Sequence, residues 1–234
     1  MEGTSGADIF GHALYDHFKG NKPAKLWINN KYGPKEEMPV NIYFRDAVDM
    51  PELELVALDA CKGKILDIGA GAGSHTLILQ NSGKDVTALD VSSGAVSLMK
   101  ERGVTKAINQ NIFLYNDERF DTLLLLMNGI GLCGNIRNLR LFLRNTKTLL
   151  KPSGQLLFDS SDISYLYNGN VPVDNYYGEL WYQYAYKGKR TEWFQWLYID
   201  KDTLMGISSE EGWAIEILFE DDFDGYLARL MVAE

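Results

Sequence analysis

Cysteine, histidine and long apolar runs are scarce in this chain of 234 residues. Its two cysteines, Cys61 and Cys133, lie far apart without Cys-x-x-Cys spacing. We therefore expect two buried free thiols in a reducing compartment, without a disulfide framework or a zinc site. The three histidines are too few and too dispersed for a metal cluster, so we expect no bound metal.

Segments that would direct the chain to a membrane or out of the cell are also lacking. No apolar run approaches the ~20 residues that a membrane-spanning helix needs. Residues 1–10 show no basic region followed by an apolar stretch, which a secretory signal would require. We therefore expect a cytoplasmic protein that does not associate with membranes.

The chain has no excess of basic charge. It carries 23 Lys and Arg against 32 Asp and Glu, which gives a formal net charge of -9. An acidic protein is not steered toward phosphate backbones or anionic surfaces. The densest basic group, residues 187–190, is interpreted as a solvated turn. The composition therefore disfavours nucleic acids and favours a small molecule as partner.

The length suits one large globular domain, with 46% apolar and 24% charged residues. The first fifty residues differ from the rest. Apolar spacing predicts a helix over residues 7–18, and residues 20–39 indicate a loop around a short extended piece at Leu26-Trp27-Ile28. We expect residues 1–50 to form an N-terminal helical arm and residues 51–234 to form the core domain.

From Pro51 onward, short apolar runs alternate with segments of helical periodicity. This alternation predicts an α/β fold with a doubly wound, mostly parallel sheet, whose ligands bind beyond the carboxyl ends of the strands. The expected strands span 64–68, 85–90, 106–112, 121–127 and 155–159, and the expected helices span 51–60, 74–81, 92–103 and 138–150, with a stop and turn at 151–154.

The pattern changes after the fifth expected strand. Residues 176–199 are rich in Tyr and Trp, alternate as strands do, and predict an inserted aromatic β-hairpin. A helix over 200–211 and a terminal antiparallel strand pair at 214–219 and 226–232 complete the expected fold. The aromatic side chains suit a packed sheet face, a lid or pocket wall over a ligand, or an exposed surface through which a homodimer forms.

A glycine-rich turn carries the strongest functional signal. Residues 65–74 read Ile-Leu-Asp-Ile-Gly-Ala-Gly-Ala-Gly-Ser, a strand that runs into three glycines and then a helix. Glycine permits positive φ and close approach of the backbone to a ligand, and the helix start offers free N–H groups. Asp67 precedes the first glycine by two residues, and Asp90 ends the next strand, where an acid can accept hydrogen bonds from ribose hydroxyls.

With these motifs the chain resembles the class I S-adenosylmethionine-dependent methyltransferases, in particular a small, bacterial-type subgroup with an aromatic hairpin after the fifth strand. The motifs of the resemblance cover residues 51–159. The resemblance implies a Rossmann-like fold and in-line transfer of the methyl group to a small-molecule acceptor, with S-adenosylhomocysteine as product. The cofactor-binding residues that it implies are Asp67, Gly69, Ala70, Gly71, Gly73, Asp90, Val91, Asn111, Ile112 and Met127.

Within that set the family places each residue in a part of the cofactor. The segment 67–73 surrounds the methionine part, Asp90 holds the ribose, and Val91 packs beside the adenine. Asn111 departs from the family, which often has an acid after the third strand to meet the adenine amino group; an amide oxygen can accept the same bond. Met127 and Asn128 are expected near the methionyl end and the acceptor.

Other interpretations stay open at the level of sequence. A nicotinamide or flavin site would have Gly-x-Gly-x-x-Gly spacing, but Ser74 stands where its third glycine would be. An aminopropyl-type transferase on the same fold, or a noncatalytic cofactor-binding or interaction subunit, would keep the motif.

The sequence identifies no catalytic base. A base is required when the acceptor is a hydroxyl or a protonated amine. The candidates are His75, Asp159, Asp162 and Tyr165. The aromatic-basic group at 43–45 is expected either to pack the arm on the sheet or to close over the cofactor, with Arg45 on its carboxylate.

Overall fold

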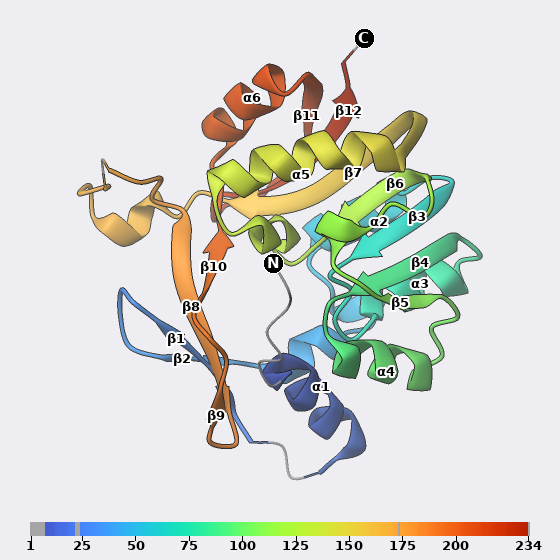
Figure 1. Cartoon of the computed structure of the whole chain (residues 1–234), viewed down its shortest axis with the longest axis vertical. Coiled ribbons are helices and arrows are strands. Elements are labelled where there is room, and N and C mark those ends of the chain that lie inside the picture. Colours follow the sequence, from blue (N-terminus) through green and yellow to red (C-terminus); the bar gives the residue numbers. More distant parts are fainter. Residues whose placement is uncertain (1–7, 22–23, 173, 234) are drawn as a thin grey trace.

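The computed structural model describes residues 8–21, 24–172 and 174–233, and these residues build two β-sheets (Figure 1). The first residue of the expected N-terminal helix, Ala7, lies outside the described residues. The larger sheet has seven strands and carries the helices of the core, and the smaller sheet stands beside it. None of the described helices is long and apolar enough to cross a membrane.

The seven-stranded sheet has the order β11-β12-β7-β6-β3-β4-β5. Five of its strands are parallel, and the last two along the chain pair antiparallel at one edge. The expected fold class is therefore confirmed. The order reverses at β3, which lies between β4 and β6, so a ligand site is expected beyond the ends of these strands. The strands are β3 (Lys64–Ile68), β4 (Asp85–Asp90), β5 (Ala107–Asn109), β6 (Phe120–Leu125), β7 (Leu150–Ser161), β11 (Trp213–Glu220) and β12 (Gly225–Val232).

Helices cover both faces of this sheet, which explains the continuous apolar runs of its strands. Alternate side chains point to opposite faces: Leu123 packs with the helices α5 (Ile136–Leu149) and α6 (Lys201–Glu210), while Leu124 packs with α2 (Glu52–Ala60) and with Leu79 of α3 (Ser74–Asn81). The helix α4 (Ser93–Glu101) packs on Ala88 through Val96 and Met99.

The smaller sheet joins two distant parts of the chain. β1 (Leu26–Asn30) pairs antiparallel with both β2 (Glu36–Met38) and β8 (Glu179–Tyr186). β8 also pairs with β10 (Phe194–Leu197), and the short β9 (Lys189–Arg190) closes the hairpin. The expected hairpin is therefore confirmed, but the strands of the N-terminal arm extend it. The division of the chain at residue 50 stays a prediction.

The N-terminal helix α1 (Ile9–Lys19) ties this region to the core. The Asp8 carboxylate accepts a hydrogen bond from Gly11 N at 2.9 Å and caps α1. The same carboxylate accepts from Gly94 N and from the Ser92 hydroxyl, both at 2.8 Å, at the start of α4. One side chain therefore stabilises the first turns of two helices.

Three expected boundaries are wrong by three residues or more, and several others by one or two, such as the end of β6 at Leu125 in place of Met127. The third strand ends at Asn109, because the Asn111 side chain accepts from Phe113 N and starts the 3-10 turn η3 (Ile112–Leu114). β7 begins at Leu150 and has no break at 151–154, because Leu150 already pairs with Phe120 of β6. The register shifts after this pair, so that Thr122 pairs with Gln155. β10 begins at Phe194, whereas the alternating pattern predicts extended chain from Thr191, because the Thr191 hydroxyl accepts the Tyr184 N–H in place of a ladder bond.

Both cysteines are buried free thiols, as expected. Burial raises the pKa of Cys61 to about 12 and raises the pKa of Cys133 as well. Since a thiol reacts as its thiolate, burial disfavours reaction at both residues.

Candidate functional site

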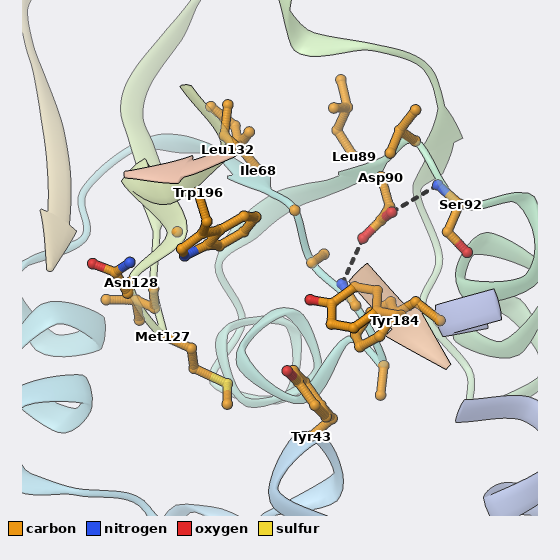
Figure 2. Close-up of a pocket in the computed structure, with 18 of the residues that line it drawn as sticks. Tyr43, Ile68, Leu89, Asp90, Ser92, Met127, Asn128, Leu132, Tyr184 and Trp196 are labelled. Atoms are coloured by element: carbon orange, nitrogen blue, oxygen red, sulfur yellow. Dashed lines mark hydrogen bonds between the residues drawn. The ribbon is translucent and has the colours of Figure 1, made fainter. Parts of the chain in front are cut away.

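A cavity of about 920 Å³ lies beyond the carboxyl ends of β3, β4 and β6. The glycine-rich turn and the ends of these strands form one wall. Residues of α1, of the 3-10 segment η1 (Val40–Phe44) and of the smaller sheet form the other. Figure 2 shows Asp90 and Ile68 on the core side, with Tyr43, Tyr184 and Trp196 around the same space.

The glycine-rich turn brings bare backbone to the cavity. The N–H groups of Gly69 and Ala70 both donate to the carbonyl of Leu89, at 2.8 and 3.2 Å. Gly69, Gly71 and Gly73 have positive φ angles of 72°, 56° and 80°, which side chains rarely adopt. A Cβ on Gly69 would meet nothing within 4 Å, so the space over this residue is open to a ligand.

Gly73 serves packing. A Cβ at this position would lie 2.9 Å from Cγ of Met99, so the absence of a side chain lets α3 approach α4. Gly73 does not line the cavity. The third glycine of the motif therefore positions the helix start and leaves ligand approach to the first two.

Asp90 holds the turn and faces the cavity (Figure 2). One carboxylate oxygen accepts from Gly71 N and the other from Ser92 N, each at 2.8 Å. The residue is only 6% exposed. Burial raises the pKa of Asp90, while the two backbone N–H groups act in the opposite direction. Each oxygen keeps a second lone pair, so the carboxylate can still accept bonds from two neighbouring hydroxyls of a ligand.

The structure brings most of the predicted cofactor residues to this cavity. Asp67 lies beneath the glycine turn and accepts the Thr76 hydroxyl at 2.5 Å, which ties α3 to β3, and it does not line the cavity. Burial raises the pKa of Asp67. The predicted residues that do line the cavity are Gly69, Ala70, Gly71, Asp90, Val91, Asn111, Ile112 and Met127.

Two cations lie at one end of the cavity and share one acid. His75 Nε2 lies 2.8 Å from one carboxylate oxygen of Glu54, and Arg45 donates to the other. Burial acts to lower the pKa of His75, but the neighbouring Glu54, Asp67 and Asp159 raise it overall, which favours a charged ring. Arg45 Nε is buried and has no hydrogen-bond partner among the described residues. This end can therefore attract an anionic group of a ligand.

Glu54 was missed as part of the site. Its place in the first turn of α2 indicates a favourable interaction with the helix dipole, which explains the residue without any partner. Burial acts to raise the pKa of Glu54, whereas His75 and Arg45 lower it overall. No local signal links these three residues, because the contact joins three separate elements.

Beyond β6 the backbone is strained where it meets the cavity. Met127 and Asn128 have φ angles of 61° and 54°, and left-handed residues other than glycine cost about 1–2 kcal/mol each. Asn128 N donates to both oxygens of Asp159, at 2.9 and 2.8 Å. The Asn128 side chain also accepts from the Ser160 hydroxyl at 3.0 Å and donates to the Leu197 carbonyl at 3.1 Å. The surrounding strands thus hold a conformation that is typical of functional sites.

The aromatic hairpin forms the far wall of the cavity. Phe10 lies between Tyr43 and Tyr184, with ring centroids 5.0 and 5.7 Å away. Trp196 rests on Gly131, where a Cβ would lie 2.1 Å from the indole nitrogen. Of the three roles considered for the hairpin, the structure therefore supports the pocket wall for its inward face. The aromatic side chains that line the cavity are Phe10, Tyr43, Phe113, Tyr182, Tyr184, Trp196 and Tyr198.

Comparison with known proteins decides the family. A family model described as a methyltransferase domain matches residues 66–158. The chain is similar to an S-adenosylmethionine-dependent methyltransferase from Bacteroides fragilis, whose crystal structure is a complex with S-adenosyl-L-homocysteine. The two sequences are 41% identical. The match covers 97% of this chain and 95% of that one, with a TM-score of 0.90. The chain belongs to the family of S-adenosylmethionine-dependent methyltransferases.

More distant relatives share only part of this methyltransferase. Demethylmenaquinone methyltransferases from Corynebacterium glutamicum (strain R) and Tropheryma whipplei (strain Twist) are 33% and 27% identical over 94 and 99 residues. The matches cover 40% of this chain and 39–40% of those proteins. The chain thus matches about two fifths of the length of these curated relatives. A match of this extent does not show that the chain acts on their substrate.

The cavity fits the cofactor of the family. S-adenosylmethionine combines a ribose with two neighbouring hydroxyls, a flat adenine and a methionine carboxylate. Asp90 supplies acceptors for hydroxyls, and the open space over Gly69 admits a ligand to the backbone. Arg45 and His75 supply positive charge at another part of the same cavity.

Proposed function

We propose that this methyltransferase moves the methyl group of S-adenosylmethionine to a small-molecule acceptor held against the aromatic wall. The observation that carries the proposal is the continuity of one cavity. Its core wall contains the glycine-rich turn and Asp90, and its opposite wall contains tyrosines and a tryptophan. A cofactor bound on the first wall would face an acceptor on the second without a barrier of protein between them.

On the core wall, we assign Asp90 to the ribose of the cofactor. We assign the backbone of Gly69, Ala70 and Gly71 to its methionyl part. Val91, which is 74% exposed, and Ile112 offer apolar contacts for the adenine. The cavity-lining Asn111 offers an amide beside them; its oxygen already accepts from Phe113 N at 3.0 Å and keeps a second lone pair.

At the far end, we assign the methionine carboxylate to the cations Arg45 and His75. The strained turn at Met127 and Asn128 then lies between the cofactor and the aromatic wall. Nε2 of His75 is paired with Glu54, which argues against the use of His75 as a catalytic base.

The contribution of the protein to the reaction is orientation. The bound cofactor supplies an activated methyl group, which a nucleophile displaces in line. The aromatic wall aligns the acceptor and excludes water, and the rigid turn at Met127–Asn128 fixes the backbone beside it. Positioning of this kind supplies much of the acceleration of a bimolecular transfer.

Family membership favours this function over the alternatives left open by the sequence, namely aminopropyl transfer and a noncatalytic role. The name of the partial relatives also brings a quinone into consideration, since a flat ring could stack on the aromatic wall. A hydroquinone therefore belongs in the acceptor screen.

The test is release of S-adenosylhomocysteine from S-adenosylmethionine in the presence of a library of small acceptors, with products identified by mass spectrometry. The proposal predicts turnover with a small molecule. It predicts that Trp196→Ala lowers kcat/KM for that acceptor while the affinity for S-adenosylhomocysteine changes little. Equal loss of both quantities would contradict the division of the cavity into two walls.

A further inference from the structure

The charged side chains that line the cavity indicate the chemical class of the acceptor. This inference rests on the proposed function. Five side chains with a formal charge or a titratable imidazole line the cavity: Asp8, Glu36, Arg45, His75 and Asp90. Four of them are engaged within the protein or assigned to the cofactor. The fifth, Glu36, lies on the smaller sheet.

Each of the other four side chains has a partner within the protein or a proposed role in binding the cofactor. The carboxylate of Asp8 accepts from Gly11, Ser92 and Gly94. Arg45 and His75 both pair with Glu54, at the end assigned to the methionine carboxylate. Asp90 holds the glycine turn and is assigned to the ribose.

Glu36 is exposed and lines the cavity, which places it at the opening. It lies opposite Ile28 in the sheet, and within the described part of the chain its side chain accepts only a long bond of 3.4 Å from Asn30. The neighbouring Glu37 pairs with Lys25 and lies opposite Trp27. Since alternate residues of a strand point to opposite faces, Glu36 faces the cavity and Glu37 faces away.

Tyrosines line the cavity together with Glu36, and Ile28 of β1 lies opposite both Glu36 and Tyr184 in the smaller sheet. Burial is the largest cause of the raised pKa of Tyr182 and Tyr198, and the charge of Glu36 adds to it in both. Burial likewise raises the pKa of Tyr184. These phenols therefore stay neutral at physiological pH, and they offer hydroxyl groups and ring faces but no positive charge. Among the described cavity-lining residues that are neither engaged within the protein nor assigned to the cofactor, Glu36 thus carries the one formal charge, and it is negative.

This electrostatic pattern discriminates between classes of acceptor. Transfer to a neutral amine moves the positive charge from sulfur to nitrogen, so a wall of ring faces and one carboxylate stabilises the charge as it forms. A carboxylate or phenolate acceptor would need a cation to hold it in the cavity, and the described part of the acceptor wall offers none. We propose that the acceptor is an amine and that Glu36 selects it.

The step balances without a further reagent. A protonated amine is attracted by Glu36 and loses one proton to water at the opening. The nitrogen lone pair then forms the N–C bond with the methyl carbon while the C–S bond breaks and its electron pair stays on sulfur. The products are the neutral thioether and a methylammonium, which releases its proton to water.

The test compares probes of the same shape and different charge. S-adenosylhomocysteine-loaded protein is titrated with phenethylamine, phenethyl alcohol and phenylacetate, with ligand-detected NMR as the readout. We expect the amine to bind most tightly. We expect Glu36→Gln to weaken its binding about tenfold, the loss expected for one hydrogen-bonded charge, and the matched Glu37→Gln to leave it unchanged.

Turnover provides the second readout. Among acceptors of the library that react, we expect N-methylated products, with kcat/KM reduced about tenfold by Glu36→Gln and unchanged by Glu37→Gln. Tighter binding of phenylacetate, methylation of oxygen acceptors only, or equal behaviour of the two variants would overturn the inference. Failure to bind S-adenosylhomocysteine would instead refute the proposed function, so the two failures are distinguishable.

Discussion

Asp90 combines a structural role with the ligand-binding role that we propose for its carboxylate. It accepts the N–H groups of Gly71 and Ser92, which fixes its two oxygens beside the glycine turn. A sequence pattern is enough to find such a residue, because the end of a strand and the spacing from the glycines determine its place. Asp67 also lies near the end of its strand, but its side chain points inward and accepts a hydrogen bond from the Thr76 hydroxyl. The spacing of the residues does not predict this direction.

For Asp90→Asn we predict at least a tenfold loss of affinity for S-adenosylhomocysteine, since a charged acceptor is replaced by a group that also presents N–H donors. Calorimetry measures the loss. Asp85→Asn is the matched control, because Asp85 lies at the other end of the same strand and pairs with Lys106 at the surface. Unchanged affinity in a folded Asp90→Asn protein would refute the assignment of the ribose.

Asp159 makes a prediction about pH. Burial raises its pKa to about 6, above the ordinary value of 3.8. A carboxyl group that is harder to ionise in the folded state contributes stability below pH 4, and this contribution is lost as the pH rises through 6. The neutral Asn in Asp159→Asn has no such dependence and can still accept from Asn128 N.

Thermal melts from pH 4 to 7 check this prediction. The Tm of Asp159→Asn relative to the native protein should rise across that range, by roughly 2–4 °C for each kcal/mol recovered. Asp85→Asn is again the comparison. Because Lys106 lowers the pKa of Asp85, the contribution of this carboxylate is lost mainly below pH 4, and the Tm difference of Asp85→Asn should stay nearly constant from pH 4 to 7. A constant difference for Asp159→Asn would show that its carboxyl group titrates as in the unfolded chain.

At the scale of elements, the smaller sheet is anchored to the core by a contact that only glycine permits. Trp196 of β10 packs on Gly131 of η4 (Gly129–Cys133). For Gly131→Ala we predict destabilisation of about 1–3 kcal/mol, because the rigid indole must move. We also predict a fall in methyl transfer, because the indole lines the cavity.

Gly206→Ala is the control for that substitution. A Cβ at Gly206 meets nothing within 4 Å, and the residue lies within helix α6, so alanine should stabilise by up to ~1 kcal/mol. Denaturant unfolding and the transfer assay measure both effects. A Gly131→Ala protein with native stability and activity would show that Trp196 is not fixed by this contact.

The core elements were predictable and the edges were not. β3 and α3 have the expected bounds, because an apolar run, three glycines and a helical period follow one another without conflict. β5 is shorter than predicted, because Asn111 offers the backbone a local bond that competes with the ladder. The outcome of such competition depends on the neighbouring strands, so the local sequence pattern does not predict it.

At the scale of the whole molecule, the cavity arises from two sheets that the sequence reveals separately. The glycine motif predicts one wall and the aromatic hairpin predicts a sheet face, but nothing local shows that the two face each other. The pairing of β1 with β8 joins residues more than 150 positions apart, such as Ile28 and Tyr184. The acceptor wall, and with it Glu36, could therefore be assigned only from the structure.

The central claim is that one cavity holds the cofactor on the core wall and leaves the aromatic wall for the acceptor. The most direct test is a crystal structure of this methyltransferase with S-adenosylhomocysteine. The account predicts ribose hydroxyls on Asp90, the homocysteine carboxylate near Arg45 and His75, and the sulfur facing the tyrosine wall. A ligand whose homocysteine occupies the aromatic wall, or whose ribose lies away from Asp90, would contradict it.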